Sequence, residues 1–213
     1  KLKGSLIYLN PIRCNYNKNM NFLDITQISD LEDKRIFVVD NFYRDPYAVR
    51  KFALEQQFID DLRYYKGRRT ETRFHIPGTK EAFESIIGRK ITSWDNQPMN
   101  GVFQSCNAQD ALVYHIDHQR WAGMIYLTPN APFESGTSMY AHKGTKVRHG
   151  SEPGIDSAFS GGFYDGTKFE LVDKIGNVFN RLVIFNGHCI HAASQYFGQS
   201  VEDSRLFHMF FFD

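Results

Sequence analysis

From about residue 101 to its end, the chain consists of short apolar runs divided by turn residues, and this alternation most constrains its fold. The runs are rich in β-branched and aromatic residues, which favour strands. Seven of them span residues 101–107, 111–117, 120–127, 136–142, 180–185, 189–197 and 204–212. Many short strands separated by turn signals are typical of an all-β sandwich or barrel, so we expect a mainly β body here.

The residues before this β body predict a mixture of strands and helices. The segment 35–42 is rich in Val, Ile and Phe and predicts a strand. Asp45 followed by Pro46 is a typical helix start, with a capping side chain and a proline in the first turn. The apolar spacing that follows predicts a helix over 45–58. A second, shorter helix is expected over 79–88, ended by a glycine.

Two further segments predict loops. The stretch 61–73 is strongly basic and favours a solvated connection over a binding site. The glycine-rich stretch 150–166 predicts a long surface loop that could act as a lid. We place a boundary near residue 100, between an α+β extension of residues 1–100 and a β core of residues 101–213, and expect the two to pack as one structural unit.

The composition argues against several classes of function. Lys and Arg number 25 against 24 Asp and Glu, a formal net charge of +1, which offers no positive excess for nucleic acid or an anionic membrane surface. No apolar run approaches the roughly 18 residues of a membrane helix. The cysteines, Cys14, Cys106 and Cys189, are odd in number and lack the spacing of a zinc site. We therefore expect a cytoplasmic protein with neither nucleic acid nor membrane as a partner.

The main chemical signal combines histidines with a carboxylate. His115 and Asp117 are two residues apart, so a strand would place both side chains on one face. The His-x-Asp pair alone is weak evidence for a metal site, because a chain with eight histidines readily contains such a pair by chance. His191, however, follows an apolar run further along the chain. Two histidines and one carboxylate that leave coordination positions open form the facial triad of non-haem Fe(II) oxygenases.

Arg205, at the start of the last apolar run, adds a second signal. An arginine that faces an apolar barrel interior is costly unless it meets an anion, and its planar fork suits a carboxylate. Arg205 therefore predicts a dicarboxylate ligand, and a buried acid of the chain is the alternative partner. By alternation, Arg205, Phe207, Met209 and Phe211 share one face of this run. We expect that face to line the barrel interior and the N-terminal helices to cover the other.

These residues give the sequence a resemblance to a known family. It is similar to the 2-oxoglutarate/Fe(II)-dependent dioxygenase superfamily, nearest to the prolyl-4-hydroxylase-like branch, over about residues 101–212. The segment YHIDHQRWAGMIYLTP at 114–129 resembles the family pattern of His-x-Asp followed by a strand that ends in Tyr-Leu and a turn. The resemblance implies a mainly β fold, a double-stranded β-helix or cupin-like jelly roll, with the N-terminal α+β extension packed on its major sheet.

The resemblance also implies the roles of five residues. His115, Asp117 and His191 match the iron ligands, and they are therefore both the metal-binding and the catalytic residues. Arg205 matches the basic residue that binds the far carboxylate of 2-oxoglutarate. Tyr126 is similar to the tyrosine that adds a hydroxyl to the same carboxylate. The implied cofactors are Fe(II), 2-oxoglutarate as co-substrate, and O2.

The sequence departs from the family pattern at one place and agrees with it at another that bears on the expected reaction. The interval from His191 to Arg205 is longer than this branch usually shows, so residues 198–203 would form an extra turn. Asp117 is present, whereas the halogenating members carry a small residue at that position. The resemblance therefore implies hydroxylation or a related oxidation.

Other histidines offer alternatives to these assignments. His188 is a rival third ligand, but it lies within a turn, whereas His191 follows a strand-like step, so we favour His191. His118 is expected to point outward or to line an entrance. His208 is most simply a histidine of the core.

We therefore expect an oxidoreductase that oxidises an unidentified small-molecule or peptidyl substrate. The segments 61–75 and 143–170 are expected to build its substrate pocket. Two alternative interpretations remain at this stage. One is a cupin-like metal-dependent isomerase or hydrolase, and the other is a non-catalytic jelly-roll binding module.

Overall fold

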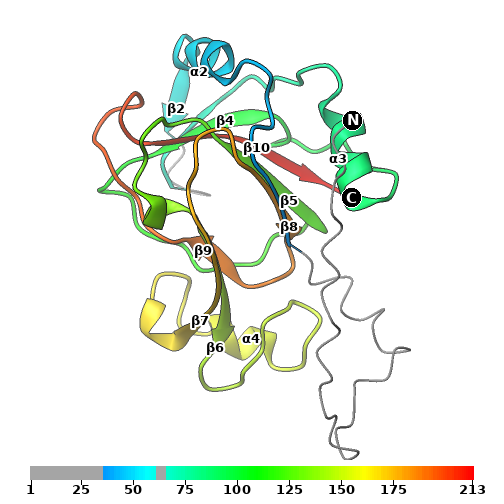
Figure 1. The fold of residues 1–213 in the computed structure, drawn as a ribbon. Helices are drawn as coiled ribbons and strands as arrows, with labels where there is room; N and C mark the ends of the chain where they lie inside the picture. The colour runs from blue at the N-terminus through cyan, green and yellow to red at the C-terminus, as the bar shows by residue number, and fades with distance from the viewer. Residues whose placement is uncertain (1–35, 61–65) are drawn as a thin grey trace, which may run out of the picture.

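Two antiparallel β-sheets form the body of the protein in the computed structural model, which describes residues 36–60 and 66–213 (Figure 1). The strands are β1 (Ile36–Val39), β2 (Phe58–Asp60), β3 (Arg68–Thr70), β4 (Val102–Cys106), β5 (Trp121–Tyr126), β6 (Thr137–His142), β7 (Phe169–Ile175), β8 (Leu182–Asn186), β9 (His191–Ala193) and β10 (Arg205–Phe212). The helices are α2 (Pro46–Leu54), α3 (Thr79–Ile87) and α4 (Ile155–Phe159), with short 3-10 turns η2 (Phe133–Ser135) and η3 (Gly166–Lys168).

The strand order gives the jelly-roll architecture. The larger sheet has seven strands in the order β1-β8-β5-β10-β4-β3-β2, and the smaller has three in the order β7-β6-β9. The mainly β fold expected from the sequence is thus confirmed. The segments before residue 100 contribute three strands to the larger sheet, with β1 on one edge and β2 on the other. Among the residues that the structure describes, no helix is long and apolar enough to cross a membrane.

Helix α2 begins as the sequence predicts. The Asp45 carboxylate accepts a hydrogen bond from the backbone N–H of Ala48 at 3.0 Å, and Pro46 occupies the first turn. The helix is shorter than expected, since it ends at Leu54 and Phe58 already belongs to β2. Helix α3 matches its expected range and ends at Gly88, which is left-handed with φ 72°.

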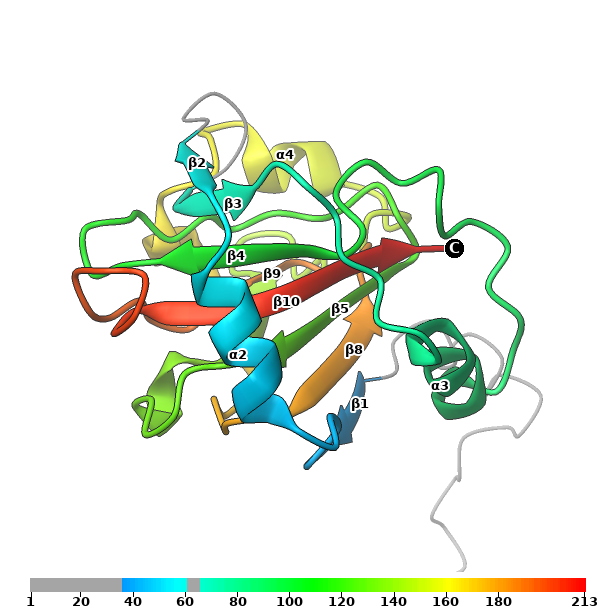
Figure 2. The ribbon, with the colours of Figure 1, turned by 90° about the horizontal axis from the view of Figure 1, so that it is seen from above.

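The two helices cover the outer face of the larger sheet, on the side away from the smaller sheet (Figures 1 and 2). Ala53 of α2 and Phe83 of α3 are fully buried in one cluster with residues of the sheet. The Phe83 ring lies 5.1 Å from that of Phe210 and 5.5 Å from that of Phe212, centre to centre. The expected faces of β10 are therefore confirmed, with Leu206, Phe210 and Phe212 under the helices.

His208 shares that outer core, as the sequence suggested. It is completely buried, and its Nδ1 lies 2.7 Å from the hydroxyl of Tyr43. Burial lowers the pKa of His208 to about 3, so the ring is neutral at physiological pH. His208 therefore has a structural role and lies apart from the inner face of the sheet.

Three local expectations differ from the structure. Residues 111–117 do not form a regular strand, because His115 makes only an isolated bridge to His191. Strand β7 was not expected, since its charged residues interrupt the apolar pattern. The stretch 150–166 is not only a loop, because it contains the helix α4. Ala158 of α4 is fully buried in one cluster with Phe169 of β7.

Candidate functional site

A cavity of about 400 Å³ lies between the two sheets. Its inner wall comes largely from β5 and β10, as the alternation along the last strand predicts: Arg205, Phe207, Met209 and Phe211 all line it. The expected metal ligands His115, Asp117 and His191 also line the cavity. A volume of this size is typical of a small-molecule site.

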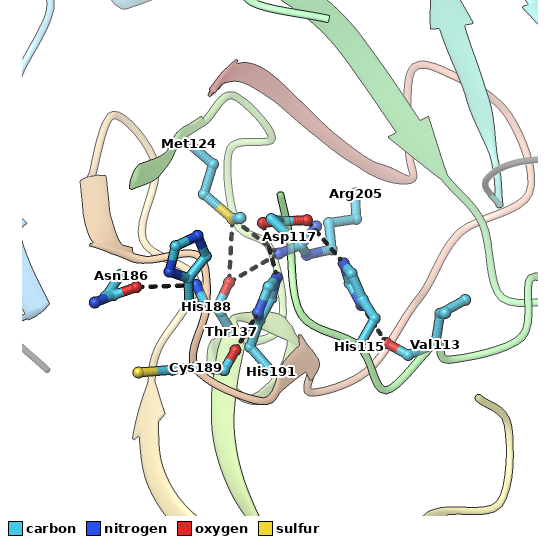
Figure 3. A network of polar contacts seen from close by, with 10 residues as sticks. All are labelled: Val113, His115, Asp117, Met124, Thr137, Asn186, His188, Cys189, His191 and Arg205. Atoms are coloured by element: carbon cyan, nitrogen blue, oxygen red, sulfur yellow. Dashed lines mark hydrogen bonds and ion pairs between the residues drawn. The ribbon is translucent and has the colours of Figure 1, made fainter. Parts of the chain in front are cut away.

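His115, Asp117 and His191 converge at one wall of this cavity (Figure 3). The Nε2 atom of His115 lies 3.4 Å from one carboxylate oxygen of Asp117, and the Nε2 atom of His191 lies 3.4 Å from the other. One ligand atom from each residue falls within 4.8 Å of the other two. Two nitrogens and one carboxylate can therefore approach a single ion.

Backbone pairing brings these residues together. The N–H of His115 donates to the carbonyl of His191 at 3.0 Å, and the N–H of His191 donates back to the carbonyl of His115 at 2.9 Å. The N–H of Asp117 donates to the carbonyl of Gly187 at 2.7 Å. A side chain at position 187 would overlap its surroundings, because a Cβ there would lie 2.5 Å from the carbonyl oxygen of Gln119 and 3.0 Å from the Cβ of Asp117. The glycine thus makes room for the carboxylate.

The Nδ1 atoms of His115 and His191 are each hydrogen-bonded to a backbone carbonyl. Nδ1 of His115 lies 2.9 Å from the carbonyl of Val113, and Nδ1 of His191 lies 2.8 Å from the carbonyl of Cys189. A carbonyl only accepts, so Nδ1 is the protonated nitrogen in each neutral ring. The Nε2 lone pairs then face Asp117, which is the arrangement of metal-binding histidines.

The carboxylate of Asp117 is kept ionised. Burial raises its pKa, but the neighbouring His191 and His115 rings outweigh burial and lower the pKa well below its ordinary value. Burial lowers the pKa of His115, but the neighbouring Asp117 carboxylate and the backbone carbonyl of Val113 together outweigh burial and raise the pKa. One oxygen of Asp117 is buried without a hydrogen-bond partner among the residues described. An unsatisfied anionic oxygen beside the Nε2 atom of His191, with the Nε2 atom of His115 beside the other oxygen, fits a divalent cation.

Arg205 lies in the same cavity and is only 2% exposed. Its Nε donates to the carbonyl of Ser135 at 2.8 Å, and its Nη2 donates to the carbonyl of Gly136 at 3.2 Å. No carboxylate lies within ion-pair distance of Arg205 in the described part of the chain. The alternative of a buried acid as its partner thus finds no support there, and a buried guanidinium bound to neutral carbonyls suits an anionic ligand.

Tyr126 is placed differently from its expected role. It is fully buried, and its hydroxyl lies 2.8 Å from Oγ1 of Thr137. Thr137 lines the cavity, whereas Tyr126 is absent from the lining. The Arg205 guanidinium stands 5.2 Å above the tyrosine ring. Tyr126 therefore contacts Arg205 and Thr137 from the side away from the cavity and does not itself face the cavity.

The remaining histidines lie elsewhere. His188 is on the turn before β9, and its Nε2 lies 3.1 Å from the backbone carbonyl of His118. It is not part of the group that includes His191. His118 is exposed, as expected. The turn predicted at 198–203 is present, because backbone N–H groups of residues 199 and 200 bond to the carboxylate of Asp203.

Lys66, Arg69 and Phe163 line the cavity, in agreement with the expectation that the segments 61–75 and 143–170 build the pocket. The interpretation of 61–73 as a solvated connection is wrong for Lys66 and Arg69, and sequence reasoning singled out neither residue. Residues 61–65 of that stretch, like Cys14, lie outside the described residues. Tyr196 also lines the cavity, and burial raises its pKa well above the ordinary value. Within 61–75, alternation along a strand places Arg68 and Arg69 on opposite faces, so that one of them points inward.

Known structures share this fold at low sequence identity. HygX from Streptomyces hygroscopicus, crystallised with nickel, 2-oxoglutarate and hygromycin B bound, is 11% identical with a TM-score of 0.53, over 88% of this chain and 86% of that one. AviO1 from Streptomyces viridochromogenes Tue57 is 10% identical with a TM-score of 0.51, over 91% and 96%. A prolyl hydroxylase from Trichoplax adhaerens, in complex with a hypoxia inducible factor peptide fragment, is 13% identical with a TM-score of 0.49, over 88% and 86%.

HygX and AviO1 share the fold of this chain, which confirms the jelly-roll fold that the resemblance implies. No curated protein matches the chain. A family defined by sequence does match it, over residues 23–204, which is most of its length. The chain therefore belongs to the family of unknown function DUF6445.

Proposed function

We propose that this protein is an Fe(II)- and 2-oxoglutarate-dependent dioxygenase that hydroxylates an organic substrate. The observation that carries the proposal is the convergence of His115, Asp117 and His191 on one wall of a cavity that also holds the buried Arg205. The fold shared with HygX supports the same conclusion. A cupin-like isomerase or hydrolase is not favoured, because it would not use the dicarboxylate co-substrate that the buried Arg205 suits.

The proposed metal ligands are Nε2 of His115, Nε2 of His191 and the carboxylate of Asp117. The carbonyls of Val113 and Cys189 hold the rings in the required tautomer. Three protein ligands leave coordination positions open for a co-substrate and O2. When bound, iron supplies O2 activation coupled to the decarboxylation of 2-oxoglutarate to succinate.

Arg205 is the proposed anchor for the distal carboxylate of 2-oxoglutarate. The carbonyls of Ser135 and Gly136 orient its guanidinium, so little rotamer freedom is lost when the anion binds. Thr137 lines the cavity, and its Oγ1 lies 3.3 Å from Nη2 of Arg205 and 2.8 Å from the hydroxyl of Tyr126. We therefore assign Tyr126 a positioning role in co-substrate binding.

The rest of the cavity protects the reaction from water. Phe185, Phe207 and Phe211 line it, and Phe185 lies 4.7 Å from the His191 ring, centre to centre. Apolar walls strengthen the interactions of the buried charges and restrict side reactions with water.

Turnover of 2-oxoglutarate tests this function. Purified protein supplied with Fe(II) and 2-oxoglutarate in air should form succinate and CO2, with faster turnover when the true substrate is added. Asp117→Ala should reduce succinate formation to the rate of free Fe(II), because one metal ligand is lost. The control variant His118→Ala changes an exposed neighbour and should keep the wild-type rate. Equal rates in wild type and Asp117→Ala would contradict the proposal.

A further inference from the structure

We propose that the primary substrate is a small organic anion, whose carboxylate or phosphate group binds Arg69 while its apolar body lies in the cavity. This inference rests on the proposed function, since it assigns the second ligand of the same cavity. Arg205 would then bind the co-substrate, and Arg69 would bind the substrate.

Sheet pairing places Arg69 on the inner wall. Arg69 of β3 pairs with Gln104 of β4, and Gln104 pairs in turn with Phe207 of β10. The three residues form one row across the larger sheet, and all three line the cavity. Arg68, the neighbour of Arg69, points to the other side and is exposed, beside the carboxylate of Asp60 at 3.2 Å.

Gln104 fixes the orientation of Arg69. The Nε of Arg69 donates to the side-chain oxygen of Gln104 at 2.8 Å. The side-chain nitrogen of Gln104 donates to the carbonyl of Lys66 at 2.8 Å, and Gln104 is only 6% exposed. A buried amide that receives one bond and gives another has a single orientation, so the guanidinium is held by its Nε edge.

The approach of residues 66–67 to β4 depends on a glycine. Gly67 has φ +76°, and a Cβ there would overlap the carbonyl of Ser105 and lie 2.7 Å from Sγ of Cys106. The N–H of Gly67 donates to the carboxylate of Asp110 at 3.2 Å. These contacts seat Lys66 at the cavity, beside Gln104.

The charge of the lining favours an anion. Among the described residues that line the cavity, the cations are Lys66, Arg69 and Arg205, and the carboxylate is Asp117. Fe(II) and 2-oxoglutarate carry equal and opposite charges, so their binding does not change the net charge of this lining. A guanidinium fork fits a carboxylate or phosphate, so an anionic substrate suits the Arg69 side chain.

The rim indicates the rest of the substrate. Phe163 lines the cavity yet is 47% exposed, and its carbonyl accepts a bond from the N–H of Tyr114 at 2.7 Å. Tyr164 is 58% exposed, and the ammonium of Lys66 lies 5.2 Å from its ring. Exposed aromatic side chains, one of them beside the ammonium of Lys66, suit a molecule with a ring or apolar body and an acidic group.

Calorimetry with two matched probes tests the assignment. The probes are phenylacetate and its neutral isostere phenylacetamide, titrated into protein saturated with Ni(II) and 2-oxoglutarate, so that no turnover occurs. Phenylacetate should bind the wild type roughly tenfold or more tightly than phenylacetamide. Arg69→Gln should abolish this preference, and Arg69→Lys should keep part of it because the charge remains. Arg68→Gln is the matched control and should keep the full preference.

The outcomes separate this inference from the proposed function. Equal binding of the two probes to the wild type would overturn the inference, as would an unchanged preference in Arg69→Gln. If Arg69→Gln instead weakens 2-oxoglutarate binding and spares the probe preference, Arg69 is a co-substrate residue and the inference is wrong. Failure of 2-oxoglutarate to bind the wild type would overturn the proposed function, while the probe comparison could still be made on Ni(II)-loaded protein. Phenyl phosphate in a third titration distinguishes a phosphate from a carboxylate head group.

Discussion

Asp117→Ala should weaken divalent metal binding by more than roughly 100-fold, since even an outer partner of a metal ligand typically contributes 10- to 100-fold. His191→Ala should have a comparable effect. Each variant keeps only two of the three protein ligands, and two ligands cannot form the facial triad. Anaerobic calorimetric titration with Fe(II) measures the change.

Control variants decide which histidine completes the group. His188→Ala alters a ring that bonds the carbonyl of His118 and lies outside the cluster, so it should retain wild-type metal affinity. The thermal unfolding midpoint of each variant checks that the fold persists. If His188→Ala loses the metal and His191→Ala retains it, the assignment of the third ligand is wrong.

Arg205→Ala should raise the dissociation constant for 2-oxoglutarate by a factor of about 30 to several thousand, which corresponds to roughly 2–5 kcal/mol for a buried charged pair. Arg205→Lys should cost less, because it keeps the charge but loses the planar fork. The titration is made with the metal site saturated, so that loss of the anchor is distinguished from loss of metal. Arg68→Ala, on the exposed side of β3, is the surface control.

Tyr126 gives a graded comparison within the same experiment. Tyr126→Phe removes the contact with Thr137 but leaves Arg205 in place, and should cost about 0.5–1.5 kcal/mol of 2-oxoglutarate binding. An unchanged affinity in Arg205→Ala would reject the anchor, and with it most of the case for this co-substrate.

Much of the fold could be predicted because burial and turn residues are local signals. The alternation in the last strand correctly separated the cavity face, with Phe207 and Met209, from the helix face, with Phe210 and Phe212. Strand β7 could not be identified in this way. Only its two ends are buried, and its middle is half-buried or exposed, so its position depends on pairing with β6.

The candidate site was only partly readable from the sequence. The spacing of His115 and Asp117 suggested a shared face, yet their convergence with His191 comes from reciprocal backbone bonds and not from a regular strand. Arg69 could not be singled out from the sequence, because it lies in a basic stretch that is typical of a solvated loop. Its inward direction follows from pairing with Gln104 on β4, a residue distant in sequence.

The metal dependence of 2-oxoglutarate binding tests whether the cavity is a 2-oxoglutarate-dependent iron site. Wild-type protein should bind 2-oxoglutarate tightly under anaerobic conditions when Fe(II) is present, because one end would chelate the metal and the other would meet Arg205. Without metal, or in Asp117→Ala with Fe(II) present, binding should weaken by more than roughly 100-fold. Binding of equal strength with and without Fe(II), or no binding in either case, would contradict the assignment of this cavity to a 2-oxoglutarate-dependent iron site.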